Sequence, residues 1–107
     1  MSVVAYVPDL MDRSKVAAAV PGVVVVRSLD DLVAAATPGT TVVVDLSRTG
    51  VLDAIRQIVG SRVIGFGSHV DAELLRAARA AGCETVLARS VFFSRIAEIV
   101  GYGDGGS

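Results

Sequence analysis

A carboxylate stands at the end of a strongly hydrophobic strand pattern near the middle of the chain. The valine run 42–44 is unbroken, and Asp45 follows it directly. Such a β-branched run is typical of a strand that is buried on both faces of a parallel sheet. Ligands of open α/β sheets bind beyond the carboxyl ends of the strands, so Asp45 is the first candidate for a working acid.

Further polar residues follow the other strand patterns and are expected at the same edge of the sheet. Asp9 follows the first pattern, Ser68 the fourth and Arg89 the fifth, while Arg48 comes shortly after Asp45. Asp9 and Asp45 follow neighbouring strands of the expected sheet, so their carboxylates should lie close together. Arginine can bind a carboxylate or phosphate through two hydrogen bonds, so Arg48 or Arg89 could instead hold Asp45 in an ion pair.

The chain alternates strand and helix patterns along its length. Strand patterns cover residues 2–7, 23–27, 42–44, 62–67 and 84–88, and helix patterns cover residues 9–20, 28–36, 50–59, 70–81 and 90–100. This alternation predicts a single α/β domain over residues 1–100. We expect a three-layer, doubly wound fold with a five-stranded parallel sheet in the order 2-1-3-4-5 and five helices. Residues 101–107 are glycine-rich and predict a flexible tail.

Residues that cap helices mark several of the helix starts. Asp9 and Ser28 each precede a helix pattern, and their side chains are expected to accept hydrogen bonds from its first turn. Ser68 and Asp71 have the spacing of a capping box, so Ser68 is expected to cap the fourth helix. The third helix is expected to reach Val59 and to turn that side chain toward the sheet.

The composition excludes several functional classes. With ten basic and eleven acidic residues, the 107-residue chain has a formal net charge of −1, which is no strong field for nucleic acid or an anionic membrane. No apolar run approaches the roughly 20 residues needed to span a bilayer. The single cysteine, Cys83, excludes an internal disulfide and is typical of a reducing compartment. We therefore expect a cytoplasmic protein that binds neither nucleic acid nor membrane.

The last helix pattern carries two neighbouring apolar stripes. One contains Phe92, Ile96 and Ile99, and the other contains Phe93, Ala97 and Val100. A helix docked on a sheet needs an apolar face about 100° wide, and two stripes exceed that width. Both stripes could be buried in one wide contact. The alternative is a surface for a protein partner, or for a second copy of the chain, formed by Phe92, Phe93, Ala97 and Val100.

The chain resembles the receiver domains of two-component response regulators, which are bacterial-type signal-transduction domains. Residues 43–46, Val-Val-Asp-Leu, with Gly50 five residues after the aspartate, match the family's third strand and the turn that follows it. Residues 83–93 are similar to the family's strand-five segment. The resemblance covers residues 3–100 and implies a flavodoxin-like fold, Asp45 as the phosphoacceptor and Mg²⁺ as the cofactor. It also implies that Asp9 and Asp45 are the candidate ligands of the metal. It also implies dimerisation through strand five and its flanking helices.

Several positions differ from the family's pattern. The family has adjacent acids at the end of strand one, where this chain has Asp9, with Asp12 a helical turn further on. A lysine followed by proline is replaced by Arg89 and Ser90. Half of an acidic pair should bind Mg²⁺ poorly, because the ion needs several carboxylates in near-octahedral geometry. These differences indicate a degenerate receiver, or pseudo-receiver.

Three hypotheses follow for the function. The preferred one is a stand-alone receiver-like domain that acts as a phosphorylation-independent interaction or signalling module, without enzymatic activity and without a cofactor. In the second, Asp45 is phosphorylated, Asp9 binds Mg²⁺ and Arg89 stabilises the phosphoryl group, so that any turnover is self-phosphorylation and dephosphorylation. In the third, a small anion or nucleotide binds at the same edge, at helix starts near Ser68 and Ser90.

Overall fold

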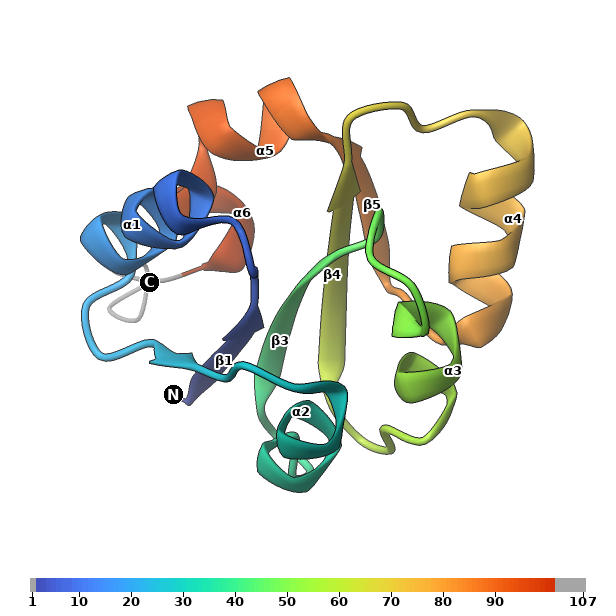
Figure 1. Ribbon diagram of the computed structural model, residues 1–107, viewed down its shortest axis with the longest axis horizontal. Coiled ribbons are helices and arrows are strands. Elements are labelled where there is room, and N and C mark those ends of the chain that lie inside the picture. Colours follow the sequence, from blue (N-terminus) through green and yellow to red (C-terminus); the bar gives the residue numbers. More distant parts are fainter. Residues whose placement is uncertain (1, 102–107) are drawn as a thin grey trace.

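Five strands and six helices make up the computed structural model, which describes residues 2–101 (Figure 1). The strands are β1 (Val3–Tyr6), β2 (Val24–Val25), β3 (Thr41–Asp45), β4 (Arg62–Gly67) and β5 (Thr85–Ala88). The helices are α1 (Leu10–Ala19), α2 (Leu29–Ala35), α3 (Val51–Arg56), α4 (Ala72–Ala81), α5 (Arg89–Ser94) and α6 (Ile96–Val100). The predicted tail at 101–107 lies outside the described residues, apart from Gly101. Within residues 2–101, no helix is long and apolar enough to cross a membrane.

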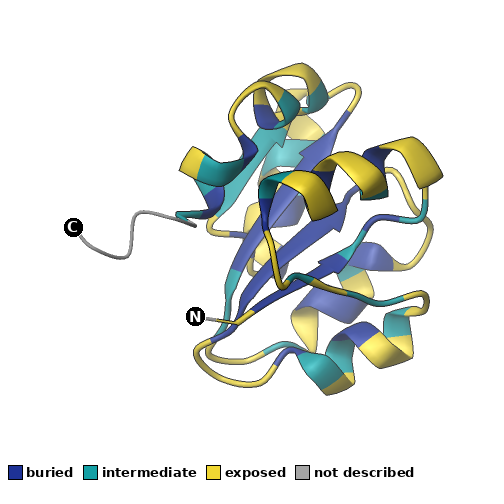
Figure 2. Cartoon of the chain, turned by 90° about the vertical axis from the view of Figure 1, so that its left-hand side faces the viewer, coloured by how far each residue is buried: buried dark blue, intermediate teal, exposed yellow. Residues whose placement is uncertain are grey.

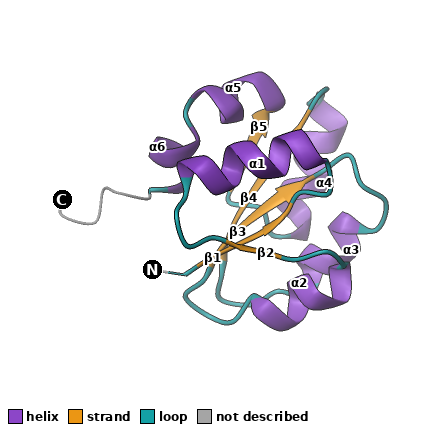
Figure 3. Ribbon diagram, turned by 60° about the vertical axis from the view of Figure 1, so that its left-hand side comes forward, coloured by secondary structure: helices purple, strands orange, loops and turns teal. Residues whose placement is uncertain are grey.

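The strands pair in parallel in the order β2-β1-β3-β4-β5, which confirms the predicted doubly wound sheet. At its centre, Val43 of β3 pairs with Ala5 of β1 on one side and with Ile64 of β4 on the other. Helices α1, α5 and α6 cover one face of the sheet, and α2, α3 and α4 cover the other (Figures 1 and 3). The carboxyl ends of all strands therefore point to one edge.

The central strand is buried on both faces, as its unbroken valine run predicts. All five residues of β3 are buried, and Figure 2 shows the buried strands in the middle of the molecule. Side chains alternate along a strand, so Val42 and Val44 pack with Leu32 on the side of α2 and α3, whereas Val43 packs on the side of α1 and α5. Asp45 is the first polar side chain after this run, and it marks the edge where the core ends.

Side-chain caps set where α1 and α2 begin. Asp9 accepts a hydrogen bond from the backbone N–H of Asp12 (3.0 Å), and Ser28 accepts one from the N–H of Asp31 (3.1 Å). Each bond satisfies an N–H of the first turn that has no partner inside the helix. Both expected caps are confirmed.

The start of α4 differs from the expectation. Asp71 caps this helix, because its carboxylate accepts a hydrogen bond from the N–H of Leu74 (2.8 Å). An acidic cap also interacts favourably with the positive end of the helix dipole. The predicted cap at Ser68 is therefore wrong. Ser68 lies in the loop after β4, and it lines a pocket at the carboxyl edge of the sheet.

Helix α3 ends earlier than its sequence pattern predicts. The N–H groups of Gln57 and Ile58 donate to the carbonyls of Ala54 and Ile55, three residues back, and tighten the last turn. A loop then connects α3 to β4, and Val59 in this loop is 74% exposed. The expectation that Val59 packs inward is wrong.

The last helix pattern forms two helices. Arg95 separates α5 from α6 with backbone angles of φ −146° and ψ 44°, which are not helical. The Ser94 hydroxyl donates to the carbonyl of Val91, and the N–H of Arg95 donates to the carbonyl of Phe92. These bonds satisfy the end of α5 without a continuing helix. The prediction of one helix over residues 90–100, and of five helices in total, is wrong, because residues 2–101 contain six.

Candidate functional site

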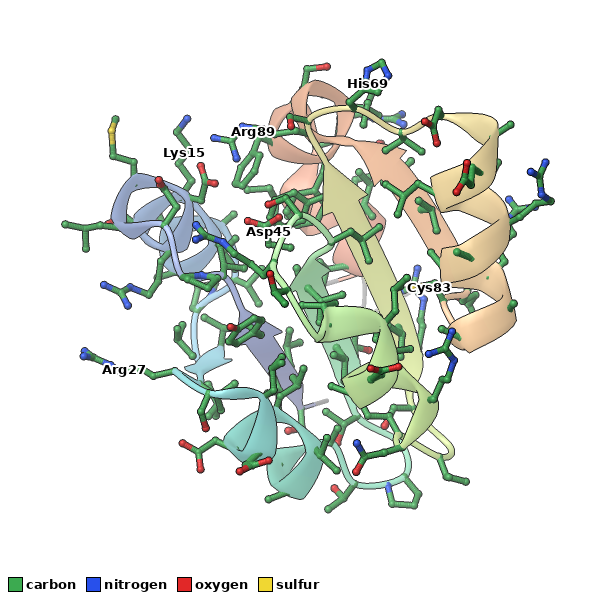
Figure 4. All side chains as sticks on the ribbon, turned by 45° about the vertical axis from the view of Figure 1, so that its right-hand side comes forward. Lys15, Arg27, Asp45, His69, Cys83 and Arg89 are labelled. Carbon is green, nitrogen blue, oxygen red and sulfur yellow. The ribbon has the colours of Figure 1, made fainter. Side chains whose placement is uncertain are left out.

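A pocket lies at the carboxyl edge of the sheet, and both Asp45 and Arg89, which are labelled in Figure 4, line it. It encloses about 210 Å³ and is called here the acidic pocket. Its lining residues are Asp9, Asp12, Asp45, Ser47, Arg48, Phe66, Ser68 and Arg89. The structure thus brings together all five residues that the sequence placed at this edge, together with Asp12, which the sequence placed one helical turn after Asp9. It adds Ser47 and Phe66, which sequence reasoning did not include.

Asp45 is 6% exposed, and both of its carboxylate oxygens already accept hydrogen bonds. Oδ1 accepts from the backbone N–H of Ser47 (3.0 Å) and from the Ser47 hydroxyl (2.7 Å). Oδ2 accepts a longer bond from Nε of Arg48 (3.4 Å), which also forms an ion pair with the carboxylate. Of the two arginines that could hold Asp45, the structure therefore selects Arg48.

Arg89 is directed to a different acid. Its two terminal guanidinium nitrogens donate to the two carboxylate oxygens of Asp12, so the pair is bidentate. Asp12 is only 2% exposed, and Arg89 is the charge that balances it. The hydrogen bonds from Arg89 to Asp12 raise the pKa of the guanidinium, with Asp9 and Asp45 adding to the effect through space.

The sequence contained a signal for the burial of Asp12. Asp12 and Val16 of α1 and its cap residue Val20 follow one another at four-residue intervals, and all three are buried. A carboxylate on an inner stripe needs a charged partner, since an unpaired buried charge is very unfavourable. That partner, Arg89, comes from the far end of the chain, where only the fold could place it.

Asp9 lies at the mouth of the acidic pocket and is exposed. Its pKa is lowered below the ordinary value of 3.8, chiefly because the N–H of Asp12 donates to its carboxylate. The backbone of Met11 and the positive charges of Arg89 and Arg48 act in the same direction. Asp9 therefore carries its charge at neutral pH, while one of its oxygens is used to cap α1.

The carboxylates of the acidic pocket are not arranged as a metal site. Within residues 2–101, no group of three Asp, Glu, His or Cys side chains is arranged to hold a metal ion. Asp12 is turned to Arg89, and Asp45 is turned to Ser47 and Arg48. Mg²⁺ needs several oxygen ligands in near-octahedral geometry, so these acids would have to leave their present partners to bind it. Asp9 and Asp45 as metal ligands stay a prediction.

Solved structures establish the fold to which this pocket belongs. A response regulator from Thermotoga maritima matches with a TM-score of 0.66, covering 94% of this chain and 97% of that chain at 17% sequence identity. A CheY-like response regulator from Mesorhizobium loti matches with a TM-score of 0.63, covering 94% and 96% at 17% identity. This chain has the receiver fold of response regulators. No protein-family model and no curated protein matches its sequence.

Aromatic side chains form the floor of this receiver fold's carboxyl edge. Phe66 and Phe92 are stacked with ring centroids 4.8 Å apart, and Phe93 packs edge-on against both rings at 5.1 Å. The guanidinium of Arg89 lies over the Phe93 ring, 4.8 Å from its centroid. Phe93 and Asp12 together hold Arg89 in place.

The same packing removes two of the four residues from the predicted partner surface. Phe92 and Val100 are fully buried, so these two side chains belong to the core and are not available to a partner. Phe93 and Ala97 are half-buried. Sequence reasoning missed Leu10 and Met11, which are 66% and 71% exposed at the start of α1. They directly follow Asp9, next to the acidic pocket of this receiver fold.

Proposed function

We propose that this receiver-fold domain is a pseudo-receiver that acts as a phosphorylation-independent protein-interaction module. One observation carries the proposal, namely that the groups needed for phosphoryl transfer are paired with other partners. The carboxylate of Asp45 is bound by Ser47 and Arg48, and Arg89 is bound by Asp12. A phosphoacceptor needs a carboxylate oxygen that is free to attack and a cation that is free to stabilise the transferred group.

The ion pairs give this edge a fixed arrangement. Asp12 and Arg89 join the first helix to the start of α5, and breaking the pair would expose a buried carboxylate to an apolar surrounding. A phosphoryl group at Asp45 would have to draw Arg89 away from Asp12. The proposal therefore includes no enzymatic turnover and no cofactor, and the edge serves as a constant surface.

The partner would be another protein or a second copy of this chain. Support comes from apolar side chains on α1, α5 and α6, the three helices that cover one face of the sheet (Figure 3). Leu10 and Met11 are exposed there, and Phe93 and Ala97 are half-buried. The net charge of −1 offers no general attraction to nucleic acid or membrane, and a single buried thiol suits the reducing cytoplasm. If the protein sediments as a monomer at high concentration, a second copy of this chain is excluded as the partner.

An NMR amide titration with Mg²⁺ and then beryllofluoride, which stands in for the phosphoryl group, tests the proposal. The wild-type protein should show no saturable shifts at Asp9, Asp45 or Arg89 at millimolar Mg²⁺. The matched control is Asp45→Asn, which keeps the shape of the side chain and removes its charge. Saturable shifts in the wild type that are absent from the control would identify a phosphoacceptor.

That phosphoacceptor is the second candidate function, and one observation favours it. Asp9, Asp12 and Asp45 all line one pocket at the carboxyl edge of the sheet. If Arg89 released Asp12 and Arg48 released Asp45, the freed carboxylates could bind Mg²⁺ and Asp45 could act as the nucleophile toward a phosphoryl group. The titration above decides between the two functions.

A further inference from the structure

A second pocket lies beside the acidic pocket, between α1 and the start of α5. It encloses about 310 Å³ and is called here the basic pocket. Its lining residues are Lys15, Ser68, Ala88, Arg89, Ser90 and Phe93. It shares Ser68 and Arg89 with the acidic pocket, but none of its six lining side chains is a carboxylate. Its volume is at the lower end of the range for small-molecule sites, about 300–1,000 Å³.

Two cationic side chains of the basic pocket each lie over the ring of Phe93. The Lys15 ammonium lies 5.5 Å from the centroid of the Phe93 ring, and the Arg89 guanidinium lies 4.8 Å from the same centroid. Figure 4 shows both side chains at the same end of the molecule. The charge of Arg89 is already balanced by Asp12, so the Lys15 ammonium is the charge that an anion in this pocket would balance.

Lys15 has its charge available for a ligand. It is exposed, and within residues 2–101 it takes part in no ion pair. Arg89 uses its two terminal nitrogens for Asp12, but a guanidinium has more N–H donors than this pair consumes. The basic pocket can therefore supply donors from Lys15 and Arg89 together, while Arg89 keeps its bond to Asp12.

The rest of the lining indicates what kind of anion would fit. The hydroxyls of Ser68 and Ser90 are additional donors, so a tetrahedral group with several acceptor oxygens matches the basic pocket better than a planar one. Phe93 and Ala88 provide an apolar wall, against which the organic part of a ligand could lie. We propose that the basic pocket binds a small phosphate ester. The inference goes beyond the interaction module proposed above and does not rest on it.

Lys15 is the only lysine in the sequence, and this makes a direct test possible. Reductive methylation with ¹³C labels the Lys15 side chain and the amino terminus and preserves the positive charge. Phenyl phosphate is the probe, titrated while the Lys15 methyl signal and the amides of residues 88–93 are followed by NMR. These signals should shift saturably at millimolar probe, and phenol, which lacks the anionic group, should leave them unchanged.

Two variants that each remove one positive charge distinguish a specific binding site from general electrostatic attraction. Lys15→Gln should weaken phenyl phosphate binding roughly tenfold, as measured by the amide shifts, because it removes one charged hydrogen-bond donor. Arg27→Gln changes binding less than about twofold, since Arg27 is exposed and lies far from Lys15 and Arg89 (Figure 4). Each variant is first shown to keep the wild-type amide spectrum elsewhere.

Four results would overturn the proposal. The absence of saturable shifts would show that no such site exists, and equal weakening by Lys15→Gln and Arg27→Gln would show only general electrostatic attraction. Binding of benzoate as tight as that of phenyl phosphate would point to a carboxylate site. Binding of inorganic phosphate as tight as that of phenyl phosphate would show that the Phe93 wall contributes nothing to recognition.

Discussion

Arg89 donates hydrogen bonds to both carboxylate oxygens of Asp12, although the two residues lie 77 positions apart in the sequence. The Asp12 side chain is 3% exposed and the Arg89 side chain is 38% exposed. Water can therefore solvate the guanidinium if the pair is broken, but it cannot solvate the carboxylate. The pair fastens α1 to the start of α5. It also keeps Arg89 from Asp45, and thus the same contact that supports the fold determines the chemistry of the acidic pocket.

This asymmetry leads to the first prediction. Arg89→Gln should lower the free energy of unfolding by about 2 kcal/mol, because it leaves the buried Asp12 carboxylate without its charged partner. Asp12→Asn should lower it by about 1 kcal/mol, since the partly exposed guanidinium that remains can turn to water. Urea unfolding at pH 7 measures both values. Arg95→Gln is the control, because both members of the Arg95–Glu98 pair are exposed and its loss should cost less than about 0.5 kcal/mol. An effect of Arg89→Gln as small as that of the control would contradict the prediction.

The cap of α1 gives a pH-dependent prediction. The folded state lowers the pKa of Asp9 below 3.8, so the charged cap stabilises the protein above the pKa of the unfolded chain. This stabilisation is lost as the pH falls through the folded-state pKa. Asp9→Ala should therefore be less stable than wild type at pH 7, and the difference should shrink in strong acid.

Asp9→Asn separates the cap from its charge. Asparagine caps helices about as well as aspartate but does not titrate. Urea unfolding of this variant at pH 7 should give a free energy of unfolding near that of wild type. In acid, the variant should not show the decrease that protonation of Asp9 causes in wild type. A constant difference between Asp9→Ala and wild type at every pH would refute the charged cap.

Two glycines of β4 provide a matched pair for the packing of the sheet. A Cβ at Gly65 would lie 2.8 Å from the side-chain carbons of Leu46, which is 7% exposed and packed in the core. A Cβ at Gly67 would meet nothing closer than 3.8 Å. Gly65→Ala should therefore lower the free energy of unfolding by about 1–3 kcal/mol, whereas Gly67→Ala should change it by less than about 0.5 kcal/mol. Thermal or urea unfolding distinguishes the two, and equal effects would show that Leu46 moves aside freely.

Cys83 should behave as an inert thiol in the folded protein. Burial raises its pKa from 9.0 to about 11, so the folded state holds the neutral form where the unfolded chain already releases the proton. The free energy of unfolding should therefore fall in wild type as the pH rises from 9 to 11, and it should fall less in Cys83→Ala.

The same burial should protect the Cys83 thiol from alkylation. Iodoacetamide at pH 8 should modify the native protein slowly and the urea-unfolded protein rapidly, as mass spectrometry would show. Rapid modification of the native protein would mean that the thiol is not buried.

The sequence by itself determined those features that depend on local patterns. The alternation of strand and helix patterns was sufficient for the parallel sheet, because parallel strands need crossover connections. The order 2-1-3-4-5 is a common arrangement for a doubly wound sheet of five strands, and the structure confirms it. The valine run before Asp45 was sufficient to bury β3 on both faces. The caps Asp9 and Ser28 depend on hydrogen bonds over three residues, and these too could be predicted.

Only the tertiary structure decided which groups pair with one another and which side chains reach the surface. The sequence left Arg48 and Arg89 as equal partners for Asp45, and the fold assigned Arg48 to Asp45 and Arg89 to Asp12. It also buried Phe92 beneath the pocket and exposed Val59 beyond α3. The physical reason is that a long side chain such as arginine can reach several acids from one backbone position. The choice among them depends on burial and distance, which elements from opposite ends of the chain create together.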